Sequence, residues 1–188
     1  MQPPNVKDIV PHLPLNVKYF LKGKSMSNHK PLLHSNYIPI FSKYATEKNT
    51  AGFSYIPVWN ILPFTYELLH DITQSIRNIT IIDIALKLGI HSIVKNTACQ
   101  LLSSSQYGVF LLTPDNRSII IYDDTMKLER IRFTIAHEIG HFALHSRSQV
   151  GIIESTSSAT AMEHEADLFA GALLYFMEIH KQPNTALA

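Results

Sequence analysis

The segment His137-Glu-Ile-Gly-His141 is the strongest constraint in this chain, because it places two histidines four residues apart with a glutamate after the first. On a helix, side chains at this spacing lie about 40° apart around the axis and about 6 Å apart along it. Two such imidazoles can bind one metal ion, and Glu138 can activate a water molecule on that ion. Apolar residues around the segment recur at helical spacing and predict a helix over residues 127–145.

A second acidic segment, Glu163-His-Glu-Ala-Asp167, lies in a predicted helix over residues 160–177 and offers a third ligand. Glu163 and Glu165 point about 200° apart on a helix, so only one of them can face the metal. We predict Glu163, because Asp167 then lies on the same face and can accept the free N–H of a ligand histidine. The alternative is a capping box, Thr160-x-x-Glu163, which would leave the ligand role to Glu165.

His145 continues the row of histidines, but on an unbroken helix it lies about 12 Å along the axis from His137. The two cannot then share one tetrahedral ion, so we predict that His145 is solvated or lies at the helix end, where it interacts favourably with the helix dipole. A metzincin-type site is excluded, because Leu144 and Arg147 stand three and six residues after His141, where that site needs glycine and histidine. The third ligand is therefore expected on the second helix.

Two longer stretches resemble the ImmA/IrrE family of small metallopeptidases. The family pattern R-x-x-F-T-x-A-H-E-x-G-H begins here at Arg130, and the pattern E-x-x-A-N/D-x-F-A begins at Glu163 and is followed by a Leu-Leu pair. The resemblance implies a zincin-like fold, a Zn²⁺ ion and cleavage of helix-turn-helix repressors in bacteria or their phages. The chain departs from the pattern after Leu174, where the family usually has proline and Tyr175 stands here.

These observations predict an α+β protein with a zincin-like minimal metallopeptidase domain over residues 63–178, in which the active-site helix packs on a small β-sheet or hairpin. The expected activity is zinc-dependent endopeptidase cleavage of a DNA-binding repressor or antitoxin-like regulator. The alternative is a non-proteolytic regulatory or interaction protein that zinc only stabilises. The expected metal ligands are His137, His141 and Glu163, the catalytic base is Glu138, and Asp167 supports a ligand histidine.

A donor that stabilises the oxyanion of the reaction is also expected near the metal. Four residues are candidates, and the sequence does not choose between them: His164, Tyr175, Tyr122 and His145.

Proline distribution divides the chain, because eight of its ten prolines lie within residues 1–63 and long helices cannot pass through such spacing. Residues 1–62 are predicted to form a proline-rich extension that packs on the catalytic domain, and the alternatives are a surface that binds a substrate or partner and a segment that blocks the cleft. Residues 179–188 are predicted to form a C-terminal tail. Helices are expected over residues 64–76 and 81–88, the second ending at Gly89.

A β-hairpin is predicted from two apolar segments, residues 107–113 and 118–122, which flank a turn that begins at Pro114. Either strand can present its edge to an extended substrate. We expect residues 118–122 to do so, because they lead directly into the first metal-binding helix.

Composition excludes several functions. A net charge of +1 argues against binding to nucleic acid or to anionic membranes. No apolar segment is long enough to span a bilayer, and the N-terminus lacks the features of a signal peptide. The single cysteine, Cys99, allows no intramolecular disulfide and suits a reducing compartment. We therefore expect a cytoplasmic protein in which Cys99 is a small buried apolar residue.

Overall fold

Helices and two small sheets make up the part of the chain that the computed structural model describes, which is residues 33–48, 54–73, 79–112, 117–145, 151–152 and 157–180. This confirms the α+β class. The elements in chain order are η2 (Ser35–Tyr37), α3 (Ile38–Tyr44), β1 (Glu47–Lys48), β2 (Ser54–Tyr55), α4 (Val58–Thr73), α5 (Ile81–Leu88), β3 (Ser92–Lys95), α6 (Asn96–Cys99), β4 (Gly108–Leu112), β5 (Ser118–Tyr122), α7 (Leu128–Gly140), η3 (His141–His145), β6 (Gly151–Ile152) and α8 (Ser157–Ile179).

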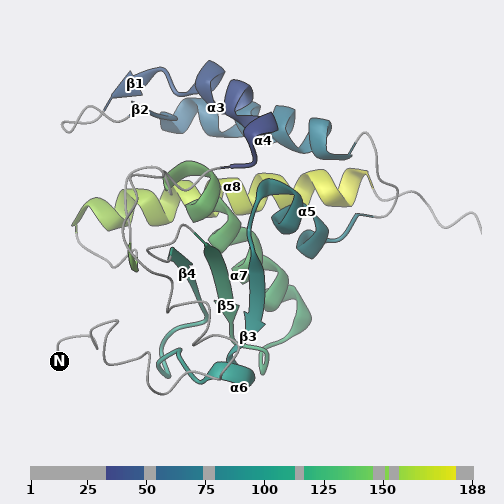
Figure 1. Ribbon diagram of the computed structural model, residues 1–188, viewed down its shortest axis with the longest axis vertical. Coiled ribbons are helices and arrows are strands. Elements are labelled where there is room, and N and C mark those ends of the chain that lie inside the picture. The colour runs from purple at the N-terminus through teal and green to yellow at the C-terminus, as the bar shows by residue number, and fades with distance from the viewer. Residues whose placement is uncertain are drawn as a thin grey trace, which may run out of the picture.

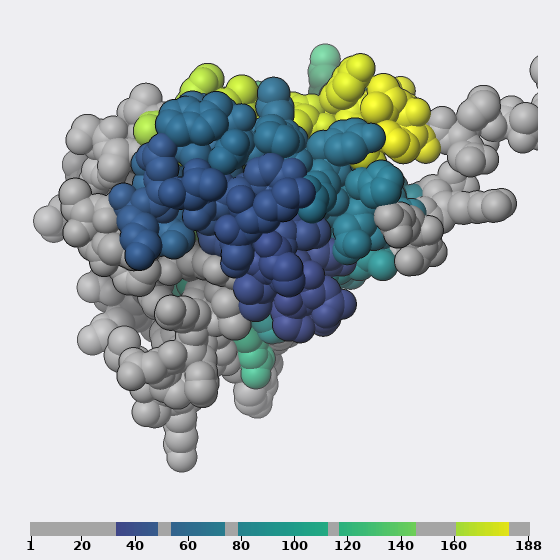
Figure 2. Space-filling model, turned by 90° about the horizontal axis from the view of Figure 1, so that it is seen from above, coloured from purple at the N-terminus to yellow at the C-terminus, as the bar shows by residue number. Residues whose placement is uncertain are grey.

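The helices and the larger sheet are stacked in layers, as Figure 1 shows. In this view α8 crosses the middle of the molecule, with α3 and α4 on one side of it and α7 and the sheet on the other. Viewed from above in Figure 2, the blue surface of α3 and α4 occupies the centre of this face of the molecule. The long helix α8 is therefore covered by α4 on one side and contacts α7, which carries the first histidine, on another.

The larger sheet has the strand order β3-β5-β4-β6. Strands β4 and β5 are antiparallel, with Phe110 opposite Ile120, which confirms the predicted pairing of the two strands, while the predicted turn at Pro114 lies outside the described residues. Strand β3 is parallel to β5, so β5 is paired on both sides. The prediction that residues 118–122 present a free edge is therefore wrong. The sequence could not reveal this, because the parallel partner β3 lies more than twenty residues earlier in the chain.

The accessible edge belongs to the first half of β4. Strand β6 pairs only with Leu111 and Leu112 at the far end of β4. Within the described residues, no strand pairs with the outer side of β4 between Gly108 and Phe110. This half of the strand thus lies at the edge of the sheet.

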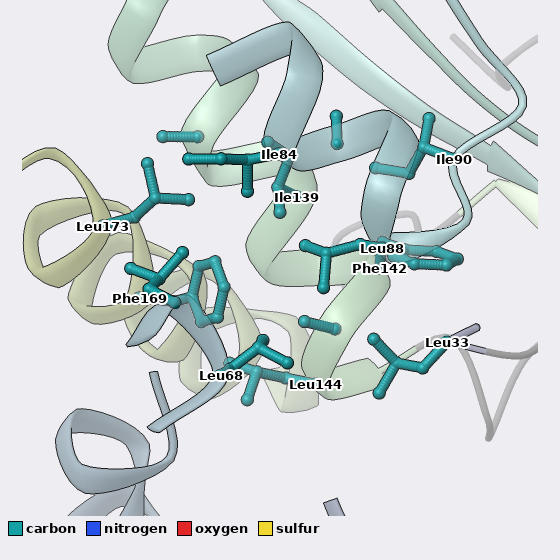
Figure 3. Close-up of a cluster of buried hydrophobic side chains, with 14 of the residues drawn as sticks. Leu33, Leu68, Ile84, Leu88, Ile90, Ile139, Phe142, Leu144, Phe169 and Leu173 are labelled. Atoms are coloured by element: carbon teal, nitrogen blue, oxygen red, sulfur yellow. The ribbon is translucent and has the colours of Figure 1, made fainter. Parts of the chain in front are cut away.

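A continuous hydrophobic core holds α5, α7 and α8 together, and Figure 3 shows side chains from these helices meeting in it. Ile139 and Phe142 from α7 and η3 belong to the same core as Phe169 and Leu173 from α8, and all four are almost completely buried. Full burial of one such side chain contributes about 1.5–3 kcal/mol. The relative position of α7 and α8 is therefore well determined, and these two helices carry the candidate site.

Helix α5 was predicted over residues 81–88, and the structure confirms these bounds. Thr80 and Asp83 form a capping box at its start, in which each side chain bonds the backbone N–H of the other residue. Gly89 ends the helix with φ 109°, in the left-handed region that glycine adopts without strain. Both ends of this helix are thus set by local residues.

Helix α4 begins at Val58, six residues before the predicted start at Phe64, so that prediction is wrong. Pro63 lies inside the helix and removes one backbone hydrogen bond. The helix nevertheless continues, because Ile61, Phe64 and Leu68 on its inner face are fully buried. Packing against the core outweighs the local cost of the proline here.

The predicted division between residues 62 and 63 falls inside α4. Upstream of α4, Leu33, Tyr37 and Phe41 are buried in the same core as α7 and α8. The Phe41 ring lies edge-on to Phe64, with 6.2 Å between ring centroids. Residues 33–44 therefore pack on the domain, whereas the predictions for residues 1–32 and for most of the tail lie outside the described residues.

Two smaller expectations concern burial and membranes. Cys99 is buried beside Ile119 and Ile121, which confirms its predicted role as a small apolar residue. Burial raises the pKa of its thiol. Across the described part of the chain, every helix is too short or too polar to cross a bilayer.

Candidate metal centre

The two histidines of the central segment meet at their ring nitrogens. His137 lies in the last turn of α7, and His141 begins the π-helical segment η3. Their Nε2 atoms are 3.0 Å apart. Two nitrogens that bind one zinc ion in tetrahedral geometry at about 2.0–2.1 Å lie about 3.3 Å from each other. The pair therefore has the spacing that one shared ion requires.

Glu163 of α8 completes the group. Its Oε2 atom lies 3.1 Å from His137 Nε2, and its Oε1 atom lies 3.3 Å from His141 Nε2. Ligand atoms of the three residues all lie within 4.8 Å of one another, a cluster that can hold a metal ion. Two imidazole nitrogens and a carboxylate oxygen are donors that Zn²⁺ commonly takes in proteins. The residues present thus fit a metal site.

The structure does not show the capping box of Thr160 and Glu163 that was the alternative to a ligand role for Glu163. Helix α8 begins at Ser157, so Thr160 lies inside the helix and is not its N-cap. Glu165 does not face the paired nitrogens of His137 and His141 but contacts His145 Nε2 at 2.9 Å. The structure therefore brings Glu163, and not Glu165, to the two histidines, while its role as a ligand stays a prediction.

A glycine lets the two helices approach closely enough for this contact. A Cβ atom added at Gly140 would lie 3.1 Å from the backbone of Ala166 and 3.3 Å from Phe169 Cβ. Such distances are tighter than ordinary packing, so a larger residue would push α8 away from α7. Because Glu163 lies about one turn before Ala166 on α8, this contact determines how closely its carboxylate approaches the histidines.

Asp167 lies beside His137, as the helical spacing predicts. Its Oδ1 atom is 2.8 Å from His137 Nδ1. In the tautomer that donates Nδ1–H to Asp167, the lone pair of His137 Nε2 is free to bind a metal. The side chains of Asp167 and Glu163 are 54% and 47% exposed, so this side of the site is open to solvent.

His145 is the last residue of η3, as the helix-terminal alternative expects, but it is not solvated, so that part of the prediction is wrong. Its residue surface is only 7% exposed, and its Nδ1 atom lies 3.1 Å from His141 Nδ1. The helix changes from α to π geometry at His141, a change that is frequent at functional sites. The assumption of an unbroken α-helix could not anticipate this change, nor that Glu165 of α8 would contact the buried side of the histidine row.

Glu138 lies on the buried side of the site, with only 7% of its surface exposed. Burial, together with the negative charge of Glu163, raises the pKa of its carboxyl group to about 8. The backbone N–H of Phe110 in β4 donates a hydrogen bond to this carboxylate and offsets part of that increase. Glu138 is thus held against the sheet at a position where its protonation state can change near neutral pH.

Gly108 allows β4 to lie directly against Glu138. A Cβ atom at this position would come within 2.4 Å of Thr134 Cγ2 and 2.9 Å of Glu138 Oε1. Real Cβ atoms do not approach other atoms this closely, so any other residue would displace Thr134, Glu138 or the strand. The sequence did not reveal this position of Gly108, because the contact joins strand β4 to helix α7, which lies twenty or more residues later in the sequence.

The electrostatic environment favours metal binding at neutral pH. Burial lowers the pKa of His141, so its imidazole is neutral. The hydrogen bond to His141 lowers the pKa of Glu163, so its carboxyl group is ionised. A neutral imidazole and a carboxylate are the forms that bind metal ions.

A cleft of about 290 Å³ opens over the site. None of the four residues expected to supply an oxyanion donor lines it, whereas Tyr107 and Arg130 do, with the Arg130 guanidinium 4.6 Å from the centroid of the Tyr107 ring. The sequence did not identify either residue as part of the site, although Arg130 begins the family pattern. The lining residues are Tyr107, Gly108, Arg130, Phe133, Thr134, His137, Glu138, Glu163 and Asp167.

The fold has the elements of a zincin-like metallopeptidase domain. These are a small sheet, the helix formed by α7 and η3 with the two histidines, and a second helix, α8, that supplies an acidic residue. A family model described as the IrrE N-terminal-like domain, a peptidase family, matches residues 94–175. This segment contains β4, β5, α7 and most of α8, so the resemblance to the ImmA/IrrE family is confirmed over these residues. Comparisons with curated proteins and with solved structures found no match.

Proposed function

We propose that this protein is a zinc-dependent endopeptidase of the cytoplasm that cleaves a DNA-binding regulator, such as a helix-turn-helix repressor or an antitoxin-like protein. The peptidase family supports the reaction class. The observation that carries the proposal is the position of Glu138, buried beside the cluster of His137, His141 and Glu163 and yet lining an open cleft. A purely structural metal site has no need of such a carboxylate.

The three clustered residues would hold the ion, and Glu138 would move the proton. When bound, Zn²⁺ lowers the pKa of a coordinated water molecule to about 7 and polarises the peptide carbonyl. The Glu138 carboxylate takes a proton from the attacking water and later delivers it to the leaving nitrogen. Its raised pKa suits this role, because the group must hold the proton between the two transfers.

The exposed edge of β4 is the proposed binding surface for the substrate chain. The Tyr107 carbonyl accepts a hydrogen bond from Asp123 on the β5 side, whereas the Phe110 N–H points to Glu138. Backbone groups alternate in direction along a strand, so Gly108 and Phe110 face away from β5. An extended peptide can add to the remaining outward groups, the N–H and C=O of Gly108 and the C=O of Phe110, beside the metal cluster.

Two cleft residues are proposed to assist the reaction. Tyr107 and Arg130 line the cleft together with Glu138, and both carry hydrogen-bond donors. A phenol or guanidinium directed at the carbonyl oxygen would stabilise the negative charge that develops on it. They replace the four candidates expected from the sequence, which do not line the cleft.

The alternative is a non-proteolytic protein in which zinc only joins α7 to α8. Such a site would be closed, with every coordination position taken by protein. The open cleft beside Glu163 and Asp167 favours the peptidase over this alternative.

The substitution Glu138→Gln tests the proposal. The zinc-loaded protein and its variant would be incubated with helix-turn-helix regulators encoded beside it, and cleavage would be followed by gel and mass spectrometry. The variant should keep zinc but lose cleavage by about 100-fold or more, because an amide cannot accept the proton. Glu129→Gln is the control, since Glu129 is an exposed acid in the first turn of the same helix. Equal cleavage by wild type and the Glu138 variant contradicts the proposed role.

A further inference from the structure

We propose that His145 and Glu165 form a positioning pair that orients the candidate ligand His141 from its buried side. This inference rests on the proposed metal site and extends it to two residues outside the cluster. His145 follows His141 in η3, and Glu165 lies on α8 two residues after Glu163. Neither side chain lines the cleft, so they act on the reaction only through His141.

The distances connect the three side chains in one direction. His141 Nδ1 lies 3.1 Å from His145 Nδ1, and His145 Nε2 lies 2.9 Å from Glu165 Oε2. The other nitrogen of His141, Nε2, faces His137 and Glu163. Each of the two imidazole rings thus has one nitrogen directed toward the metal cluster. Its other nitrogen is directed toward the next side chain, which is His145 for His141 and Glu165 for His145.

The protons in this chain can be assigned from the geometry. Only one proton can lie between the two facing Nδ1 atoms of His141 and His145. If His141 binds a metal through the lone pair of Nε2, its Nδ1 must carry that proton and donate it to His145. His145 then accepts at Nδ1, so its own proton lies on Nε2, directed at the Glu165 carboxylate. In this arrangement all four ring nitrogens of His141 and His145 have a partner, and both imidazoles are neutral.

The arrangement favours the tautomer of His141 that binds metal. A buried imidazole without a partner for its N–H loses a hydrogen bond that water would otherwise provide, which destabilises that tautomer. His145 removes this cost and fixes the orientation of the His141 ring. Asp167 does the same for His137 at 2.8 Å, so both candidate histidine ligands are held from behind, one by an exposed carboxylate and one by a buried histidine.

The test measures metal binding rather than cleavage. Zn²⁺ affinity would be determined by competition with a chromophoric chelator, and the visible spectrum of the Co²⁺-loaded protein would report the ligand geometry. We expect His145→Leu to weaken zinc binding by about 10- to 100-fold. His145→Asn should recover part of this loss, because its Oδ1 can accept the His141 proton. An equal loss in the two variants overturns the proposal, and so does an unchanged affinity in His145→Leu.

Glu165 provides a second test that does not require a substitution at the buried residue His145. Its side chain is partly exposed, so Glu165→Leu should fold, and thermal unfolding of the metal-free protein checks this. We expect weaker zinc binding and an altered Co²⁺ spectrum, with Glu165→Gln closer to wild type. An affinity and spectrum equal to those of the Glu129→Leu control overturn the proposal.

His141→Ala separates this inference from the proposed function. It should reduce zinc affinity more than any His145 or Glu165 variant, because it removes a ligand. If His141→Ala reduces affinity and the His145 and Glu165 variants do not, the positioning pair alone is wrong. If His141→Ala binds zinc as tightly as wild type, the metal site itself is wrong, and the inference fails with it.

Discussion

The open and buried sides of the metal cluster differ in how they can control charge. On the open side, Glu163 and Asp167 of α8 are about half exposed, and solvent screens their interactions. On the buried side, Glu138, His141 and His145 are almost completely covered. Burial raises the pKa of Glu138 and lowers the pKa of His141, so both shifts favour the neutral forms of these side chains.

This difference separates two requirements of the proposed reaction. A substrate needs access, which the open side provides. A general base needs a pKa near the working pH, and burial together with the negative charge of Glu163 raises the pKa of Glu138 toward it. Exposed and buried residues of the site lie close together in the sequence. The packing of α7 on the sheet determines that Glu138 is buried, whereas Glu163 and Asp167 of α8 remain exposed.

The largest effect should come from disturbing the buried side at Gly108. In Gly108→Ala the new methyl group meets Thr134 and Glu138 at impossible distances. We expect a stability loss of about 1–3 kcal/mol and cleavage reduced by about 100-fold, because the base is displaced. Thermal unfolding and cleavage assays measure the two effects.

Gly171→Ala is the matched control for Gly108→Ala. Gly171 lies in α8, and a Cβ atom there meets nothing within 4 Å. Alanine should stabilise this helix by about 0.5–1 kcal/mol without changing cleavage. If the two variants behave alike, Gly108 does not hold the base against the strand.

Much of the metal cluster could be predicted from the sequence, because it depends on local helix geometry. The i, i+4 spacing places His137 beside His141 and Glu163 beside Asp167 whatever the rest of the fold. The Gly89 cap and the hairpin are local in the same sense.

The buried side could not be predicted in this way. The burial of His145 depends on a π-helical turn and on α8, and the contact of Gly108 depends on how α7 crosses the sheet. The central position of β5 depends on a parallel strand far away in the sequence. Each is a tertiary contact, which periodicity along one segment does not encode.

The pH dependence of stability offers an intermediate test of the buried side. In the metal-free fold the pKa of Glu138 is about 8, against an ordinary value of 4.5. The folded state thus holds the proton more tightly than the unfolded state between these values. This contribution to stability is fully present below about pH 4.5 and is lost as the pH rises toward 8.

The measurement compares wild type with Glu138→Gln in the presence of a chelator. Because one pKa unit corresponds to about 1.4 kcal/mol, the stability of wild type relative to the variant should fall by a few kcal/mol, or several degrees in Tm, between pH 5 and pH 8. A difference in Tm that stays constant over this interval would show that Glu138 titrates like an exposed carboxyl group.

The smallest effect is expected on the open side, at Asp167. Asp167→Ala removes the acceptor for His137 Nδ1–H and should weaken zinc binding, toward the lower end of the range of about 10- to 100-fold found for such partners. Water can replace the lost carboxylate here, because the side chain is half exposed. At His145 no solvent is available to do so, and His145→Leu should cost more affinity in the same chelator competition. If the order of the two losses is reversed, burial does not determine how strongly a supporting group holds its ligand in this site.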